Sequence, residues 1–120
     1  MASVPPLKLV ESPGDGLQLP QNLEAEQALL GALMIDNRLV EDVMVRLRAE
    51  HFAESLHGRI YDAILKLHDR NMAATPVTLK PLFDADPAMA EVGGPAYLAM
   101  LTQNGSALLA ARDFASQIYD

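Results

Sequence analysis

Three histidines are the side chains of this sequence best suited to acid–base or metal chemistry. They are His51, His57 and His68, and no two of them have the spacing of four residues that metal sites on helices often use. His57 with Asp62, and His68 with Asp69, are the nearest approach to an acid–base pair, but that role needs a defined cleft. We therefore expect half-buried histidines that bond to the backbone, and no metal site.

The acidic residues that occur as close pairs could also serve a hydrolase or bind a metal. These pairs are Glu24 with Glu26, Glu41 with Asp42, and Asp84 with Asp86. The first pair falls in the first turn of a predicted helix, where the helix dipole favours negative charge, and the third lies in a turn before Pro87. Capping and solvation account for both pairs, and the clusters that metal catalysis requires are missing. We predict no catalytic residue.

A nucleotide-binding loop would need the pattern GxxxxGK followed by Ser or Thr, and the sequence does not contain it. Gly93-Gly94 is the one glycine pair, and Pro95 after it lacks the backbone N–H that would donate a hydrogen bond to a bound anion. Proline favours the first position of a helix, so this segment predicts a helix start. No cofactor is expected on this chain.

Composition and charge narrow the class of partner. The 120 residues carry a net charge of -7, and the best basic cluster, Arg46 and Arg48 with His51, is interrupted by Glu50. DNA binding needs clustered cations, so we expect little direct nucleic-acid binding and a basic protein partner instead. There is no cysteine, no signal peptide and no apolar run of membrane-spanning length, which predicts a soluble, cytoplasmic protein.

The best-defined element lies between Leu19 and Asn37. Asn22 is a suitable N-cap for a helix that begins near Leu23, and apolar residues then follow at spacings of three and four, with Glu26 at the edge of the stripe. Gly31 lowers helix stability by up to about 1 kcal/mol relative to Ala, which suggests that another backbone approaches closely there.

Five further helices follow from the same signals. We expect helices at 39–48, at 55–70 with Ser55 as its cap, after Thr78 with Pro81 in the first turn, from Pro95, and from Ala107 to the end after a turn at Asn104-Gly105 and a cap at Ser106. Leu79, Leu82 and Phe83 are the expected buried contacts of the fourth helix, and residues 84–92 should form its end and a turn. Residues 1–18 are rich in Pro and Gly and predict a flexible tail, which leaves 19–120 as one domain.

The predicted fold is all-α, a compact bundle of about six short helices. Its structural core is predicted to contain Leu29, Leu30, Leu33, Phe52, Ile60, Tyr61, Ile64, Leu67 and Leu98. The last helix has more apolar residues than packing on one side requires, so it is a candidate protein-interaction surface. Those candidates are Leu108, Leu109, Phe114 and Ile118.

The stretch that begins at Pro20 resembles the opening of the N-terminal domain of the DnaB family of bacterial replicative DNA helicases. The shared pattern is PxNxEAEQxLLGALMxDN, and it continues with Phe52, His57, Ile60-Tyr61, Pro76-Val77-Thr78-Leu79, Gly93-Gly94-Pro95-Ala96-Tyr97-Leu98 and Phe114-Ala115. The resemblance implies a non-catalytic assembly and docking domain that forms the collar of a hexamer. Its implied partners are the C-terminal domain of primase, a helicase loader and other copies of itself.

The resemblance also implies features outside this chain. The last helix would continue into a helical hairpin, and ATP and Mg would bind a separate motor domain. Ala53 departs from the family, which often has an aromatic residue after Phe52. Two other interpretations remain open: a small helical hydrolase that uses Asp and His, and a free-standing helical adaptor or nucleic-acid-binding domain without a motor.

Overall fold

The computed structural model describes residues 20–103 and 115–119. Within these residues the regular secondary structure is all helical and contains no strand, as predicted. The elements are α1 (Pro20–Ile35), α2 (Leu39–Val43), the 3-10 helix η1 (Ala49–His51), α3 (Ser55–Asp69), α4 (Pro76–Phe83), α5 (Pro87–Glu91) and α6 (Ala96–Leu101). Residues 115–119 are also helical.

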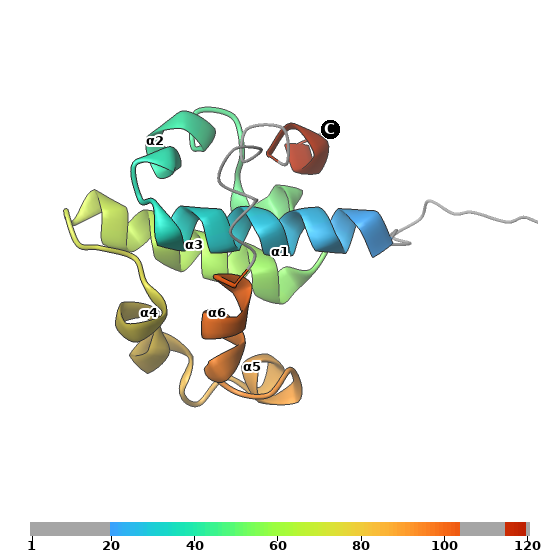
Figure 1. The fold of residues 1–120 in the computed structure, drawn as a ribbon, viewed down its shortest axis with the longest axis vertical. Coiled ribbons are helices and arrows are strands. Elements are labelled where there is room, and N and C mark those ends of the chain that lie inside the picture. Colours follow the sequence, from blue (N-terminus) through green and yellow to red (C-terminus); the bar gives the residue numbers. More distant parts are fainter. Residues whose placement is uncertain (1–19, 104–114, 120) are drawn as a thin grey trace, which may run out of the picture.

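Helix α1 lies at the centre of the molecule. Figure 1 shows it alongside α3, with α4, α5 and α6 on one side of this pair and α2 and residues 115–119 on the other. Every residue from Ala28 to Met34 is buried. A helix that is apolar on nearly all sides belongs in the interior, so α1 forms the centre against which the shorter helices pack.

The residues predicted to form the core are all buried. Leu29, Leu30, Leu33, Ile60, Tyr61, Ile64 and Leu98 are fully enclosed, and Phe52 and Leu67 are nearly so. Tyr97 and Leu101 also pack inward from α6. Leu82 was expected to be buried and is 56% exposed, because it lies on the outer face of α4 while Leu79 and Phe83 turn inward.

The expected close approach at Gly31 is confirmed. A Cβ added there would overlap the backbone carbonyl of Leu101, so α1 and the end of α6 meet backbone to backbone. Gly58 shows a milder version of the same packing, since its added Cβ would lie 2.6 Å from the carbonyl oxygen of Ala49. Both glycines let a neighbouring element lie closer than any side chain would allow.

The first two helix boundaries differ from those predicted. Helix α1 begins at Pro20, which suits a first helical turn, so Asn22 is inside the helix and is not its cap. Helix α2 ends at Val43, well before Arg48, and a turn and η1 follow. The chain turns there because Leu47 is buried and its carbonyl accepts the Tyr61 hydroxyl at 2.8 Å.

Two predicted N-caps are one to three residues from the observed ones. Glu54 caps α3, since its side chain accepts from the amide of Leu56, and Ser55 is the first helical residue. Thr75 caps α4 in a reciprocal box with Thr78, which places Pro81 inside the helix and not in its first turn. The carbonyl that Pro81 leaves without an amide belongs to the exposed Val77, where water can reach it.

The segment predicted as a turn around Met89 is the short helix α5. Asp86 caps it by accepting from the amides of Ala88 and Met89, and Pro87 is its first residue. Gly93 and Gly94 then have positive φ angles of 106° and 81°. Pro95 was predicted as the first residue of the next helix, whereas it is the N-cap of α6, which begins at Ala96. The turn at Asn104-Gly105, the Ser106 cap and residues 1–18 lie outside the described residues.

Candidate functional site

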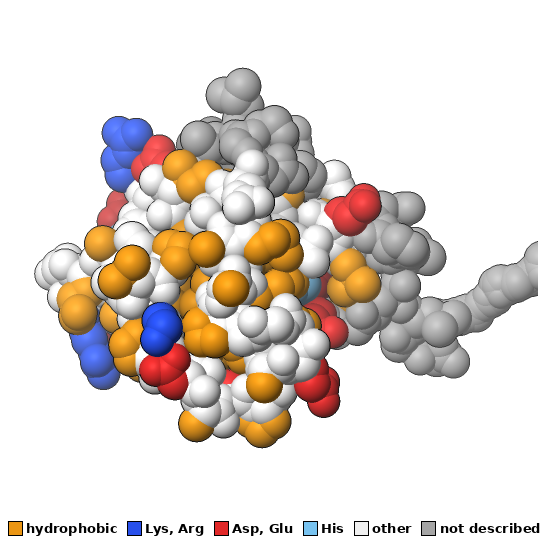
Figure 2. Space-filling view, turned by 60° about the horizontal axis from the view of Figure 1, so that its bottom comes forward, with side chains coloured by type: hydrophobic (Ala, Val, Ile, Leu, Met, Phe, Trp, Pro, Cys, Tyr) orange, Lys and Arg blue, Asp and Glu red, His pale blue; other side chains and the backbone are white. Residues whose placement is uncertain are grey.

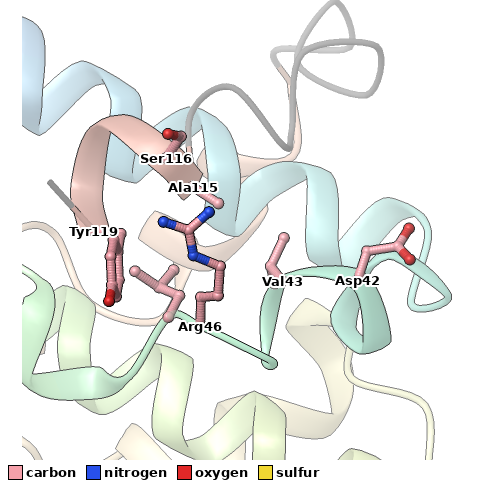
Figure 3. A pocket seen from close by; sticks show the side chains of 7 residues that line it. Asp42, Val43, Arg46, Ala115, Ser116 and Tyr119 are labelled. Carbon is pink, nitrogen blue, oxygen red and sulfur yellow. The ribbon is translucent and has the colours of Figure 1, made fainter.

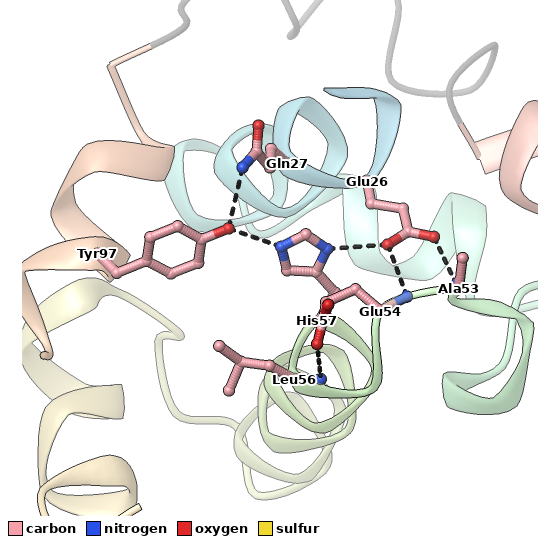
Figure 4. Close-up of polar contacts among 7 residues, drawn as sticks. All are labelled: Glu26, Gln27, Ala53, Glu54, Leu56, His57 and Tyr97. Carbon is pink, nitrogen blue, oxygen red and sulfur yellow. Dashed lines mark hydrogen bonds and ion pairs between the residues drawn. The ribbon is translucent and has the colours of Figure 1, made fainter. Parts of the chain in front are cut away.

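A chain of buried polar side chains joins α1, α3 and α6 (Figure 4). Glu26 and His57 are 1% and 2% exposed, and one carboxylate oxygen of Glu26 lies 2.8 Å from Nδ1 of His57. The other ring nitrogen, Nε2, lies 2.7 Å from the hydroxyl of Tyr97, which also accepts from the side-chain amide of Gln27 at 3.0 Å. We call these four residues the buried polar chain.

Glu26 also fixes the turn before α3. Its carboxylate accepts from the backbone amides of Ala53 at 2.6 Å and Glu54 at 3.3 Å. Because a carboxylate only accepts hydrogen bonds, Nδ1 of His57 carries a proton and donates it to Glu26. Nε2 of a neutral ring then accepts from the Tyr97 hydroxyl, so every member of the buried polar chain has a partner of the right kind.

The buried polar chain has the composition of an acid–base pair, but its geometry suits a structural role. Both nitrogens of His57 are already used, so neither is free to take a proton from a substrate. Burial raises the pKa of Tyr97, with smaller effects from the nearby carboxylates of Glu54 and Glu26 that act in the same direction and a bond from Gln27 that opposes them. The Tyr97 hydroxyl therefore stays protonated at neutral pH and can donate.

The expected role of His57 was wrong in two respects. It was predicted to be half-buried and bonded to backbone, whereas it is buried and bonded to two side chains. Glu26 was predicted at the edge of an apolar stripe and is instead enclosed. One signal was present in the sequence, since Glu26 shares the helical face of Leu23, Leu30 and Leu33, and a charge in that position needs a buried partner.

Asn37 is a second structural residue whose role the sequence did not show. In the sequence it stands only as the last residue of the stretch from Leu19 that contains the first predicted helix. Its side-chain amide donates to the carbonyls of Leu33 at 2.6 Å and Ala74 at 2.9 Å, and its oxygen accepts from the amide of Ala74 at 2.8 Å. Asn37 thereby ties the end of α1 to the segment that enters α4.

The other polar candidates have separate roles. His51 accepts from the backbone amide of Arg48 through Nδ1, and His68 lies 3.4 Å from a carboxylate oxygen of Glu41. Asp86 pairs with Arg59 of α3, and this guanidinium is the main reason why the pKa of Asp86 is lowered. Within residues 20–103 and 115–119, no group of three His, Asp or Glu side chains could hold a metal ion.

A shallow cavity of about 290 Å³ opens beside the buried polar chain. The described residues of its wall combine carboxylates with apolar and neutral polar side chains and include no Lys or Arg: Leu23, Gln27, Glu54, Leu56, His57, Ala88, Glu91, Val92 and Tyr97. Its acidic character fits a cationic ligand better than an anionic one.

The surface over α4, α5 and α6 exposes apolar side chains. Figure 2 shows hydrophobic atoms spread over this face, interrupted by charged side chains. Val77 is 79% exposed and Leu82 56% exposed on α4, and Met100 is 43% exposed on α6. Among the candidates on the last helix, Ile118 is buried at 9% exposure, and Leu108, Leu109 and Phe114 lie outside the described residues. No described helix is both long and apolar enough to cross a membrane.

Together the fold and the buried polar chain define an all-helical domain whose central polar groups serve its architecture. Residues 18–120 match the family model described as DnaB-like helicase N terminal domain, so the chain belongs to that family. The resemblance in the opening motif is thus confirmed, and the ATPase motor domain is not in this chain.

Curated relatives and one solved structure agree with this assignment. The chain is 41% identical to the replicative DNA helicase DnaB of Rickettsia prowazekii (strain Madrid E) over 102 residues. This alignment covers 85% of this chain and 21% of the relative. It is 38% identical over 98 residues to that of Mycobacterium leprae (strain TN), covering 82% of this chain and 15% of the relative. The chain thus spans about a fifth or less of these relatives.

The solved structure is the N-terminal domain of DnaB helicase from Mycobacterium tuberculosis. The two folds superpose with a TM-score of 0.74 at 34% sequence identity, over 85% of this chain and 74% of that one. The all-helical architecture is therefore shared with an experimentally determined member of the family.

Proposed function

We propose that this chain is the assembly and docking domain of a bacterial replicative DNA helicase. The observation that carries the proposal is the family match, which spans residues 18–120 and thus nearly the whole chain. The relatives bear the description replicative DNA helicase DnaB. In the whole protein, ATP and Mg would bind a separate motor domain that unwinds DNA. Six copies of the domain described here would form the collar of the helicase hexamer.

The proposed partners are the C-terminal domain of primase, a helicase loader and further copies of this domain. Two features support a docking role. Helix α4 exposes the apolar side chains of Val77 and Leu82, which a partner could cover. Figure 2 shows further hydrophobic atoms on the surface over α4, α5 and α6. The net charge of -7 favours basic proteins over nucleic acid. The proposed location is the cytoplasm, at the replisome on the nucleoid.

Calorimetric titration of this chain with the C-terminal domain of primase from the same organism tests the proposal. The docking function predicts saturable binding, either by this chain or by a version extended through the hairpin that the family implies. Heat changes no larger than those of dilution for both versions would contradict primase docking, and the same titration with the loader would then test the second partner.

A pair of matched variants tests the docking face. Val77→Ser with Leu82→Ser removes apolar surface from α4, and Val45→Ser with Met44→Ser removes it near α2, where Val45 is also 79% exposed. We expect the first pair to weaken primase binding at least about tenfold, which corresponds to about 1.4 kcal/mol, and the second to leave it unchanged. Equal effects of both pairs would exclude the α4 face as the docking surface.

A further inference from the structure

Most cations on the described surface have a carboxylate beside them. The ion pairs are Arg38 with Asp36, Arg59 with Asp86, Lys66 with Asp62, and Lys80 with Asp84. Arg46, Arg48 and Arg70 take part in none of the ion pairs among residues 20–103 and 115–119. Arg46 and Arg48 lie together in the turn between α2 and η1, in a chain whose net charge is -7.

Arg46 lies over the ring of Tyr119, and the edge of the His51 ring meets the same tyrosine. Its guanidinium carbon lies 4.6 Å from the ring centroid of Tyr119, and the ring of His51 meets Tyr119 at 4.9 Å with an angle of 69° between the planes. Figure 3 shows Arg46 and Tyr119 beside each other. Stacking leaves the N–H donors of a guanidinium free in its plane, and it restricts the side chain before an anion arrives.

Arg48 and His51 add donors next to this stack. Nδ1 of His51 accepts from the backbone amide of Arg48 at 2.9 Å, so the proton of the neutral ring is on Nε2, which can donate. Arg46, Arg48, His51 and Tyr119 line one groove together with Val45 and Glu50. We call it the arginine groove.

An apolar pocket adjoins the arginine groove and shares Arg46 and Tyr119 with it. Its volume is about 190 Å³, and its apolar lining is Val43, Leu47 and Ala115, with Asp42 and Ser116 at its polar parts (Figure 3). Sites for small molecules usually enclose roughly 300–1,000 Å³, so this pocket better suits a single aliphatic side chain.

We propose that the arginine groove binds an acidic segment of a partner protein. A carboxylate would bond to the guanidinium groups of Arg46 and Arg48, and a neighbouring aliphatic side chain would fill the pocket formed by Val43, Leu47 and Ala115. Arginine and carboxylate form paired, charge-assisted hydrogen bonds, which fits two exposed guanidinium groups. The inference rests on the proposed docking function and adds a second kind of partner to it.

Nucleic acid fits the arginine groove less well for two reasons. Two cations would neutralise few phosphates, and the affinity of DNA depends on that number. A face of the Tyr119 ring is already covered by Arg46, so it offers a poor platform for a base.

The test is an NMR titration of the isotope-labelled 120-residue chain with a blocked peptide of alternating Glu and Leu. We expect saturable shifts at the Nε–H groups of Arg46 and Arg48 and at the amides of 43–51 and 115–119. The Arg46→Gln, Arg48→Gln double variant should bind at least about fivefold more weakly. Arg70→Gln is the matched control, because Arg70 is also exposed and outside the ion pairs, and it should bind as the unaltered chain does.

Two further probes decide the class of ligand. A peptide with Gln in place of every Glu should cause no saturable shift, and an oligothymidylate should bind more weakly than the acidic peptide. Equal binding of the Gln peptide, tighter binding of the oligothymidylate to the same residues, or no shift with any probe would each overturn the proposal. Since primase docking is measured separately, such a result would leave the docking function standing.

Discussion

Glu26 is the residue on which most of the buried polar contacts depend. Its buried carboxylate accepts from the buried ring of His57 and from the part-buried backbone amides of Ala53 and Glu54. The His57 donor was taken out of water on folding, and the carboxylate of Glu26 compensates that loss. The charge of Glu26 is therefore a requirement of the fold, although it lies among apolar residues.

Replacing Glu26 by Gln should destabilise the domain by about 2–5 kcal/mol, since the amide group of Gln would face N–H donors and leave at least one of them unsatisfied. Urea unfolding at pH 7 measures the change. The exposed Glu24 is the matched control, and Glu24→Gln should stay within about 0.5 kcal/mol of the unaltered chain. Similar stabilities for the two variants would contradict a structural role of Glu26.

Tyr61 governs the response to alkali. Burial raises its pKa to about 12, above the ordinary value near 10 for an unfolded chain. Its neutral form thus stabilises the fold fully below about pH 10, and this contribution is lost as pH rises towards 12. We expect the thermal midpoint to fall over that range.

The Tyr61→Phe variant separates the two effects of this hydroxyl. At pH 7 it should be less stable by about 1 kcal/mol, because the carbonyl of Leu47 loses its donor. Its alkaline decline should be smaller than that of the unaltered chain, with a remainder from Tyr97, whose pKa is also raised. Identical alkaline declines would show that Tyr61 ionises as readily in the folded state as in the unfolded one.

Helices α1 and α6 are positioned by the absence of a side chain. The carbonyl of Leu101 occupies the space that a Cβ of residue 31 would need, so the helices can pack this closely only with glycine there. The same α6 carries Tyr97 into the buried polar chain. The packing of α6 on α1 thus brings the third element to the polar centre.

Gly31→Ala should destabilise the domain by about 2–4 kcal/mol even though alanine favours a helix by about 1 kcal/mol, because the backbone of α6 must move. Gly58→Ala should cost less, since its overlap with Ala49 is smaller. Denaturant unfolding of the two variants gives the comparison. A Gly31→Ala domain as stable as the unaltered one would mean that α6 can shift without cost.

Helix α5 depends on its N-cap, Asp86, which also joins it to α3 through Arg59. Because the folded pKa of Asp86 is lowered, its contribution is present above the ordinary carboxyl pKa near 4 and is lost as pH falls through the lowered value. Asp86→Asn should therefore be less stable at pH 7, and the difference should shrink in acid.

Thermal unfolding between pH 2 and pH 7 measures this difference. Asp84→Asn is the control, because Asp84 is more exposed and pairs at 3.5 Å with Lys80 of the adjoining helix α4. A constant difference between Asp86→Asn and the unaltered chain at every pH would contradict the role of the ion pair.

The whole domain is stabilised by one apolar core that runs from α1 through α3 to α4 and α6. Leu33 and Ile64 lie on its two central helices and are fully buried. The short helices around them have few contacts of their own and depend on this centre.

Leu33→Ala and Ile64→Ala should each cost about 2–5 kcal/mol through the cavity left behind. Leu82→Ala, on the exposed side of α4, should change stability by no more than about 0.5 kcal/mol. Calorimetric thermal midpoints check all three, and unchanged midpoints for Leu33→Ala and Ile64→Ala would disprove the core assignment.

Several features of this domain followed from the sequence alone. Its helical class, the span of α3, the burial of Ile60 and Ile64, and the approach of a backbone at Gly31 depend on periodicity, caps and glycines within a few neighbouring residues. Such signals depend only on residues that are close in the sequence, so they can be interpreted without a structure. Helix ends are less well determined, because several adjacent residues can serve as a cap, as Glu54 and Ser55 show.

The tertiary structure alone decided the environment of the polar side chains. His57 bonds to Glu26, 31 positions away, and to Tyr97, 40 positions away, and Arg46 meets Tyr119 only after the chain has folded back on itself. Helix packing brings such distant residues together, and the periodicity within one helix does not predict which residues will meet. The sequence by itself therefore predicted the elements and much of their buried faces, while the packing of α1, α3 and α6 turned separate polar residues into one connected centre.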